Sequence, residues 1–229
     1  EMQRSLVGSE MCIRDSLSPY HFLCQDNILP KNIFSFERTF VLSETPAEST
    51  PAADSSDVLN LSAPSVLLME ASTGTILYEK NPHTVLRPAS ITKIMTTLLA
   101  LENSDLNEVV TFSDDAINNT EGSGIYRDYG EQMTMEQCLY AVMLNSANEC
   151  AYAVAEHVGG TVEHFVDMMN EKAAELGCTN THFANPHGLF DENHYTTAHD
   201  MALIAKAAYQ NETFRIITCL LYTSDAADD

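Results

Sequence analysis

Positive charge is scarce in this sequence, where 11 Lys and Arg residues stand against 33 Asp and Glu residues and give a formal net charge of −22. Such a surface repels phosphates and anionic lipids, so nucleic-acid binding is not expected. No stretch approaches the roughly 18 consecutive apolar residues that identify a membrane-spanning helix. The N-terminus shows no basic region followed by an apolar run and a small-residue cleavage site, so no export signal is visible.

The usual sequence patterns of metal and disulfide sites are also missing. The six cysteines include no Cys-x-x-Cys pair and no zinc spacing, and we expect Cys138 and Cys150 to be buried free thiols. Histidine and aspartate do gather in residues 182–200, which leaves a zinc site as one alternative interpretation. No His-x-x-x-His or His-Glu-x-x-His spacing supports it, so we expect no metal and no cofactor. The residues concerned are His182, His187, Asp191, His194, His199 and Asp200.

Composition divides the chain into four segments. Residues 1–16 and 219–229 carry no periodicity and are similar to translated adapter sequence, so we predict that they are non-native. Residues 17–57 are predicted to be unstructured, ending in a linker rich in Ser, Thr, Pro and Ala. The folded domain is predicted for residues 58–218, since 45 % hydrophobic and 19 % charged residues are typical of a globular protein.

Within that domain the pattern predicts a hairpin, a helix and then a block of helices. Residues 65–70 and 75–80 are β-rich and flank a turn with Gly74. Residues 109–112 form a short apolar run, and residues 114–131 are predicted to be loop. Thr134 and Gln137 resemble a capping box, and a Thr-x-x-Asp cap precedes Ala198. Helices are therefore expected over residues 134–144, 149–157, 161–176 and 198–210.

Residues 87–99 (RPASITKIMTTLL) are predicted to form the helix on which the site is built. Its apolar residues recur at the spacing of a buried helical stripe, and Pro88 favours a helix start at residues 88–90. Ser90 and Lys93 are three residues apart, so their side chains share one face. A buried, neutral lysine can take the proton of a serine hydroxyl and make it a nucleophile. An ordinary amphipathic helix with a serine cap explains this motif equally well when it is taken alone.

A second motif, Ser146-Ala147-Asn148, falls where one predicted helix stops and the next begins. A loop at this place can direct a hydroxyl and a carboxamide into a cleft, where they can pass a proton and hold a peptide group. Ser and Asn also favour caps and turns, so a structural role in the helix–helix connection is the alternative.

In combination, these motifs closely resemble the serine-type D-Ala-D-Ala carboxypeptidases, which are low-molecular-mass penicillin-binding proteins of peptidase family S11. The shared signatures extend over about residues 60–218, and their order and spacing are highly specific to this family. They are Leu86-Arg87-Pro88-Ala89-Ser90-Ile91-Thr92-Lys93, Gly130-Glu131, Leu144-Asn145-Ser146-Ala147-Asn148, Met169-Asn170, Leu176-Gly177, Thr181-His182-Phe183-Ala184-Asn185-Pro186-His187-Gly188-Leu189 and His194-Tyr195-Thr196-Thr197-Ala198-His199-Asp200.

The resemblance implies a fold and a set of roles. The fold would be the β-lactamase/transpeptidase-like one, an α/β part with helices on an antiparallel sheet plus an all-α subdomain. Ser90 would form an acyl-enzyme at the terminal D-Ala-D-Ala of a peptidoglycan stem peptide, with Lys93 as general base. Ser146 would relay a proton to the departing D-alanine, Asn148 would bind the substrate backbone, and the Ser90 N–H would donate to the oxyanion. β-Lactams would acylate Ser90, and the location would be extracytoplasmic.

The sequence departs from the family at its third motif, because no Lys-Thr-Gly occurs anywhere in it. Ser72-Thr73-Gly74 lies upstream in a predicted turn and lacks the cation. In the family the third motif binds the substrate carboxylate, and a later C-terminal segment associates with the membrane. We therefore expect a truncated member, incomplete at its C-terminus and inactive by itself.

Two further interpretations remain open at the level of sequence. A class A-like β-lactamase shares the serine–lysine–serine–asparagine order but needs a glutamate on a later loop, where Glu192 is the candidate. A penicillin-binding fragment without turnover is also compatible with the missing third motif.

Overall fold

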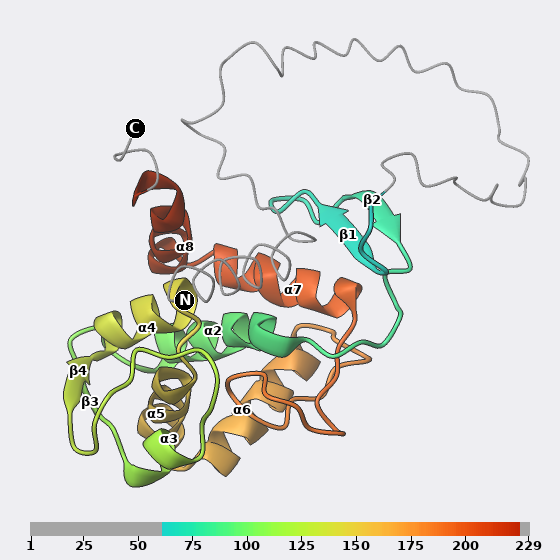
Figure 1. Ribbon diagram of the computed structural model, residues 1–229. Coiled ribbons are helices and arrows are strands. Elements are labelled where there is room, and N and C mark those ends of the chain that lie inside the picture. The colour runs from blue at the N-terminus through green and yellow to red at the C-terminus, as the bar shows by residue number, and fades with distance from the viewer. Residues whose placement is uncertain (1–60, 225–229) are drawn as a thin grey trace, which may run out of the picture. The chain divides into compact units, whose positions relative to one another are not determined.

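The computed structural model describes residues 61–224 (Figure 1). The predicted segments 1–16 and 17–57 lie outside these residues. The last described helix ends at Ser224 and so enters the segment 219–229, whose non-native origin stays a prediction. The domain boundaries 58 and 218 likewise stay predictions.

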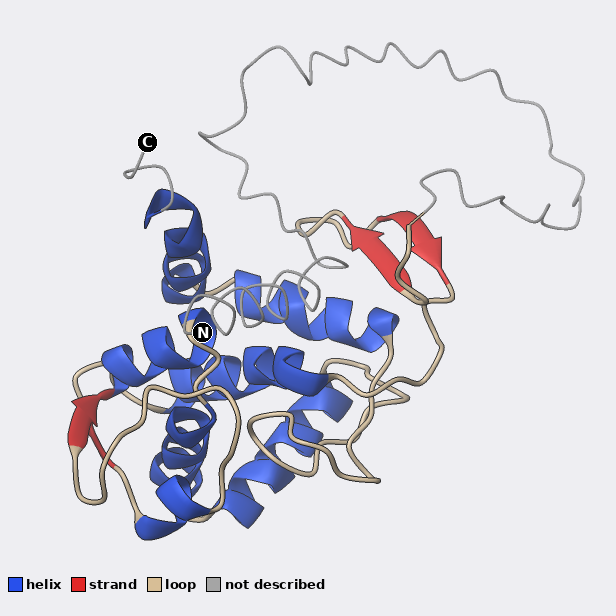
Figure 2. Ribbon diagram, in the orientation of Figure 1, coloured by secondary structure: helices blue, strands red, loops and turns tan. Residues whose placement is uncertain are grey.

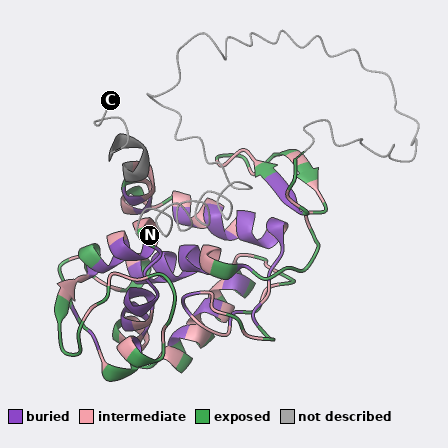
Figure 3. Cartoon of the chain, viewed as in Figure 1, coloured by how far each residue is buried: buried purple, intermediate pink, exposed green. Residues whose placement is uncertain are grey.

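The helix that carries Lys93 lies at the centre of the helical block. A 3-10 turn, η2 (Ala89–Thr92), leads directly into α2 (Lys93–Asn103), which confirms the predicted helix start. Every residue from Lys93 to Ala100 is buried, because α2 packs against α4, α5, α6, α7 and α8 (Figures 1 and 3). A helix surrounded on all sides buries more than the predicted apolar stripe, and Thr96 and Thr97 are therefore buried as well.

The predicted helices that surround α2 are confirmed, and one more helix that packs against α2 was missed. They are α4 (Met135–Leu144), α5 (Asn148–Gly159), α6 (Val162–Glu175) and α7 (Ala198–Tyr209). The capping box of Thr134 and Gln137 opens α4, and threonine side chains cap α6 and α7. The missed helix, α8 (Glu212–Ser224), packs against α4 with Phe214 and Ile217 buried.

Two small antiparallel sheets accompany the helices (Figure 2). Strands β1 (Val66–Met69) and β2 (Ile76–Lys80) form the predicted hairpin, with Gly74 at a φ of 78° in the turn. Strand β3 (Val109–Thr111) pairs with β4 (Gln132–Thr134). Neither strand β4 nor this pairing was predicted from the sequence.

Residues 114–131 were predicted to be loop throughout, and the structure corrects this at their start. Helix α3 (Asp114–Asn118) forms there because the Ser113 side chain accepts a hydrogen bond from the Ala116 N–H. Asp114 and Asp115 in its first turn also complement the helix dipole. The rest of the segment, from Asn119 to Glu131, is irregular as predicted.

The core of the helical block is apolar, with the free thiols of Cys138 and Cys150 inside it as predicted. Burial raises the pKa of the Cys138 thiol to about 12, so this cysteine is a packing residue and no nucleophile. Within residues 61–224, no helix is long and apolar enough to cross a membrane.

The cap of α4 gives a stability prediction. Replacing Thr134 by Ala removes the acceptor of the Gln137 N–H, so the free energy of unfolding should fall by about 1 kcal/mol in a urea titration. Thr134→Ser keeps the hydroxyl and serves as the control, with a change well below that of the alanine variant. Equal losses in the two variants would contradict the role of the cap.

Candidate active site

Lys93 is the group around which the candidate site is assembled. It is the first residue of α2, and only 2 % of it is exposed. Its Nζ lies 2.6 Å from Asn148 Oδ1, 2.7 Å from the His187 carbonyl oxygen and 3.4 Å from Ser90 Oγ. Burial lowers the pKa of Lys93 to about 7, and the nearby charge of Glu149 opposes part of that shift. A substantial fraction of this lysine is therefore neutral at physiological pH.

Ser90 lies one turn before Lys93, in η2 and at the edge of the buried region. Its half-buried hydroxyl faces Lys93, which confirms that the three-residue spacing brings Oγ and Nζ together. Ala89 immediately before it has a φ of 48°, in the left-handed region that L-residues rarely adopt. Such strain next to a reactive side chain is typical of functional sites.

Ser146 and Asn148 come from the connection between α4 and α5. Asn148 begins α5, accepts from Lys93 and donates from Nδ2 to the Glu121 carbonyl oxygen at 2.5 Å. Ser146 has a φ of 53° and is 6 % exposed, and its buried Oγ has no hydrogen-bond partner. The structure therefore brings Ser90, Lys93 and Asn148 into direct contact and places Ser146 two residues before Asn148.

Hydrogen bonds connect the loop of residues 185–194 to the segment that contains Ser90 and Lys93. The Thr96 hydroxyl donates to the Pro186 carbonyl, and the His187 carbonyl accepts from Lys93. Arg87 binds the same loop with Nη1, which donates to the carbonyls of Asp191, Glu192 and His194. The family resemblance named the segments around Ser90 and around His187 separately. The structure shows that they lie against each other and form one wall of the site.

Gly188 allows this loop to approach the reactive serine. A Cβ at this position would overlap the Ala89 carbonyl and lie 3.1 Å from the Ser90 nitrogen, and its φ is 90°. Only glycine meets both conditions. The sequence gave Gly188 as part of a family signature, without the reason for it.

The histidines proposed as alternative metal ligands have structural partners. His194 Nδ1 accepts from the Ala184 N–H, so its Nε2 carries the proton and donates to Thr92 Oγ1 at 2.8 Å. His182 Nδ1 contacts the Asn193 carbonyl oxygen, and His199 contacts Asp200. Among residues 61–224, no three His, Cys, Asp or Glu side chains form a group that could hold a metal ion. Glu192 is exposed and contributes its carbonyl, not its carboxylate, to a described contact.

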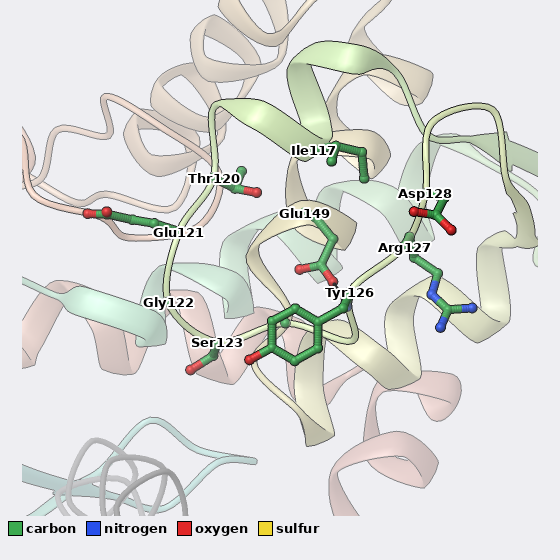
Figure 4. Close-up of a pocket in the computed structure, with 10 residues that line it drawn as sticks. Ile117, Thr120, Glu121, Gly122, Ser123, Tyr126, Arg127, Asp128 and Glu149 are labelled. Atoms are coloured by element: carbon green, nitrogen blue, oxygen red, sulfur yellow. Dashed lines mark hydrogen bonds between the residues drawn. The ribbon is translucent and has the colours of Figure 1, made fainter. Parts of the chain in front are cut away.

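A pocket of about 260 Å³ lies along the loop that Asn148 binds (Figure 4). Its lining includes the loop residues Glu121, Ser123 and Tyr126 and the buried acid Glu149. Neither Ser90 nor Lys93 lines it. The sequence gave no sign of a role for Glu149, because an acid in the first turn of a helix is ordinary.

Comparison with known proteins assigns the family. The family described as D-alanyl-D-alanine carboxypeptidase, Peptidase S11, matches residues 49–222. The chain belongs to this family. It is 41 % identical over 162 residues to D-alanyl-D-alanine carboxypeptidase DacF of Bacillus subtilis, a match that covers 68 % of the chain and 41 % of DacF.

Solved structures agree with this assignment and confirm the predicted fold. The D-alanyl-D-alanine carboxypeptidase DacD of Francisella tularensis superposes with a TM-score of 0.67 at 36 % identity, over 75 % of this chain and 43 % of that one. The DD-transpeptidase of Streptomyces K15 gives a TM-score of 0.62 at 34 % identity, over 66 % and 62 % of the two chains. The chain spans about two fifths of the length of the first curated relatives, 41 % for DacF and 38 % for DacA of Haemophilus influenzae.

The close approach at Gly188 gives a second prediction. Gly188→Ala combines left-handed backbone strain with overlap on the Ala89 carbonyl. The free energy of unfolding should therefore fall by about 3 kcal/mol or more in a denaturant titration. Gly160→Ala is the matched control, since it has a φ of 74° and no atom within 4 Å, and should cost only about 1 kcal/mol. Indistinguishable losses would show that Gly188 is needed for its backbone conformation alone.

Proposed function

We propose that this chain carries the acylation site of a serine D-Ala-D-Ala carboxypeptidase that removes the terminal D-alanine from peptidoglycan stem peptides. Ser90 is the nucleophile, Lys93 its general base, Ser146 the proton relay and Asn148 the group that binds the substrate backbone. The observation that carries the proposal is the 3.4 Å separation between Ser90 Oγ and Nζ of a buried Lys93, whose pKa is about 7.

The contacts of Lys93 explain how it can act as a base. A neutral amine has two N–H groups and one lone pair. The two carbonyl oxygens of Asn148 and His187 lie at 2.6 and 2.7 Å and take both N–H groups. The lone pair is then directed toward Ser90 Oγ, the third neighbour at 3.4 Å. As the Ser90 oxygen attacks the carbonyl carbon of the substrate, its proton moves to Lys93 Nζ.

Ser146 serves the leaving group, and Asn148 binds the backbone of the substrate. In this mechanism the C–N bond between the two D-alanines breaks, and Ser146 relays to the departing amine the proton that Lys93 took from Ser90, so Lys93 is neutral again. Its hydroxyl is buried and has no protein partner, so it is free to bond a substrate group. The Ser90 N–H is one donor for the oxyanion. Water then hydrolyses the ester and releases the shortened peptide.

The partners follow from the same chemistry. β-Lactams present a strained amide to the same nucleophile and acylate Ser90 covalently. The substrate is part of the cell wall, so we infer an extracytoplasmic location, periplasmic or on the wall side of the membrane. The acidic composition supports no nucleic-acid partner, and no membrane contact is proposed for the described residues.

Removing the base tests the mechanism. In the complete product of the gene, Lys93→Arg keeps a cation but cannot accept a proton, so acylation by a fluorescent penicillin should slow about 100-fold or more. Ser90→Ala should leave no covalent adduct in the mass spectrum. Lys80→Arg at the end of strand β2, outside the candidate site, is the control and should match the wild type. An adduct on Ser90→Ala would refute the assignment of the nucleophile.

The pKa of Lys93 predicts the pH dependence of acylation. The lowered pKa means that the neutral base accumulates as pH rises through about 7. The second-order rate constant for acylation should therefore rise about tenfold per pH unit below 6 and level off above 8. A flat profile between pH 5 and 8 would exclude the neutral lysine as the base.

Product analysis separates the carboxypeptidase from its alternatives. With the complete gene product, D-alanine release from a D-Ala-D-Ala peptide together with a long-lived penicilloyl adduct supports the proposal. Rapid turnover of the adduct would favour the class A-like β-lactamase. Covalent penicillin without D-alanine release would favour a penicillin-binding protein without turnover.

A further inference from the structure

The buried acid beside the candidate site has no role in the mechanism above. We propose that Glu149 is a positioning residue, whose carboxylate fixes the loop of residues 121–126 on the first turn of α5 and thereby holds the Asn148 carboxamide against Lys93. This inference rests on the proposed function, in which Asn148 and Lys93 belong to the reactive site.

The carboxylate of Glu149 binds the loop backbone directly. Glu149 is 6 % exposed, and its Oε1 accepts from the N–H groups of Ile125 at 2.6 Å and Tyr126 at 2.8 Å. Hydrogen bonds from amides to a carboxylate are stronger than neutral ones. In Figure 4 the Glu149 side chain points from α5 toward the loop beside Tyr126.

The loop is shaped to receive this carboxylate. A Cβ at Gly124 would lie 2.5 Å from Glu149 Oε2 and 2.8 Å from Oε1, so the glycine leaves room for the carboxylate in its present position. Tyr126 has a φ of 57° although it is not glycine, and the bond from its own N–H to Glu149 supports that strained conformation.

Asn148 and Glu149 together hold the loop at successive backbone groups. Asn148 binds the carbonyls of Glu121 and Ser123, through Nδ2 at 2.5 Å and through its backbone N–H at 2.9 Å. Glu149 then binds the next two positions, Ile125 and Tyr126. The pocket of about 260 Å³ is lined by the same loop and by Glu149 (Figure 4).

The geometry connects Glu149 to the base through Asn148. The two ends of the Asn148 carboxamide bind Glu121 and Lys93, so its orientation depends on where the loop lies. Without Glu149 the loop loses two of these four contacts, and the Glu121 carbonyl that accepts from the carboxamide is no longer held in place. The carboxylate also acts on Lys93 by charge, while the neutral imidazole of His187 faces Lys93 from the 185–194 loop.

Three variants of the complete gene product separate these contributions. In Glu149→Ala, amide hydrogen exchange at Ile125 and Tyr126 should accelerate about tenfold or more, and penicillin acylation should slow about 10- to 100-fold. Glu149→Gln keeps an acceptor oxygen and should restore slow exchange and most of the acylation rate. Because it lacks the charge that favours protonated Lys93, its acylation profile should move to lower pH. Glu136→Ala removes an exposed acid from the first turn of α4 and is the matched control.

These measurements distinguish failure of the inference about Glu149 from failure of the proposed function. Unchanged exchange at Ile125 and Tyr126 in Glu149→Ala overturns the inference, and so does accelerated exchange with wild-type acylation. If even the wild type is not acylated, the proposed function fails, and the NMR signals of the Asn148 side-chain amide decide the role of Glu149. A shift of these signals in Glu149→Ala but not in Glu136→Ala supports it, and no shift overturns it. If Glu149→Ala does not fold, Glu149→Gln replaces it in these comparisons. Wild-type exchange, amide signals and pH profile in Glu149→Gln would then overturn the role of the Glu149 carboxylate.

Discussion

The burial of the Lys93 ammonium group is the constraint on which the rest of this structure depends. A charge placed inside a protein is costly unless it is paired, and here it is met by neutral oxygens in place of a salt bridge. Asn148 and His187 supply two of these oxygens from opposite parts of the chain. The lysine therefore ties the α5 terminus and the 185–194 loop to α2, and the same burial that makes it costly lowers its pKa to about 7.

Each wall of the site is fixed by contacts that are mostly to backbone. Arg87 and Thr96 bind carbonyls of the 185–194 loop, while Asn148 and Glu149 bind the backbone of the 121–126 loop. Backbone contacts fix where a loop runs without specifying the side chains on it.

Local patterns predicted the elements well where a cap or a periodic stripe marked them. The capping box of Thr134, the Thr197 cap and the break at residues 145–148 all appear as predicted. Helix α3 and strand β4 were missed because they are short, with five and three residues. Helix α8 was missed although Asn211 accepts a hydrogen bond from the Phe214 N–H at its start. Strand β4 exists only because β3 pairs with it, and no three-residue window contains that information.

The sequence by itself determined the family, the adjacency of Ser90 and Lys93 and the helix that carries them, because these depend on spacing within a few residues and on the order of short motifs. Only the tertiary structure decided how strongly Lys93 is buried, which carbonyls hold it, why residue 188 is glycine, and that Glu149 lies against the 121–126 loop. These facts involve residues that are 23 (Tyr126 and Glu149) to 99 (Ala89 and Gly188) positions apart in the chain, and such contacts are set by packing, which local patterns do not encode.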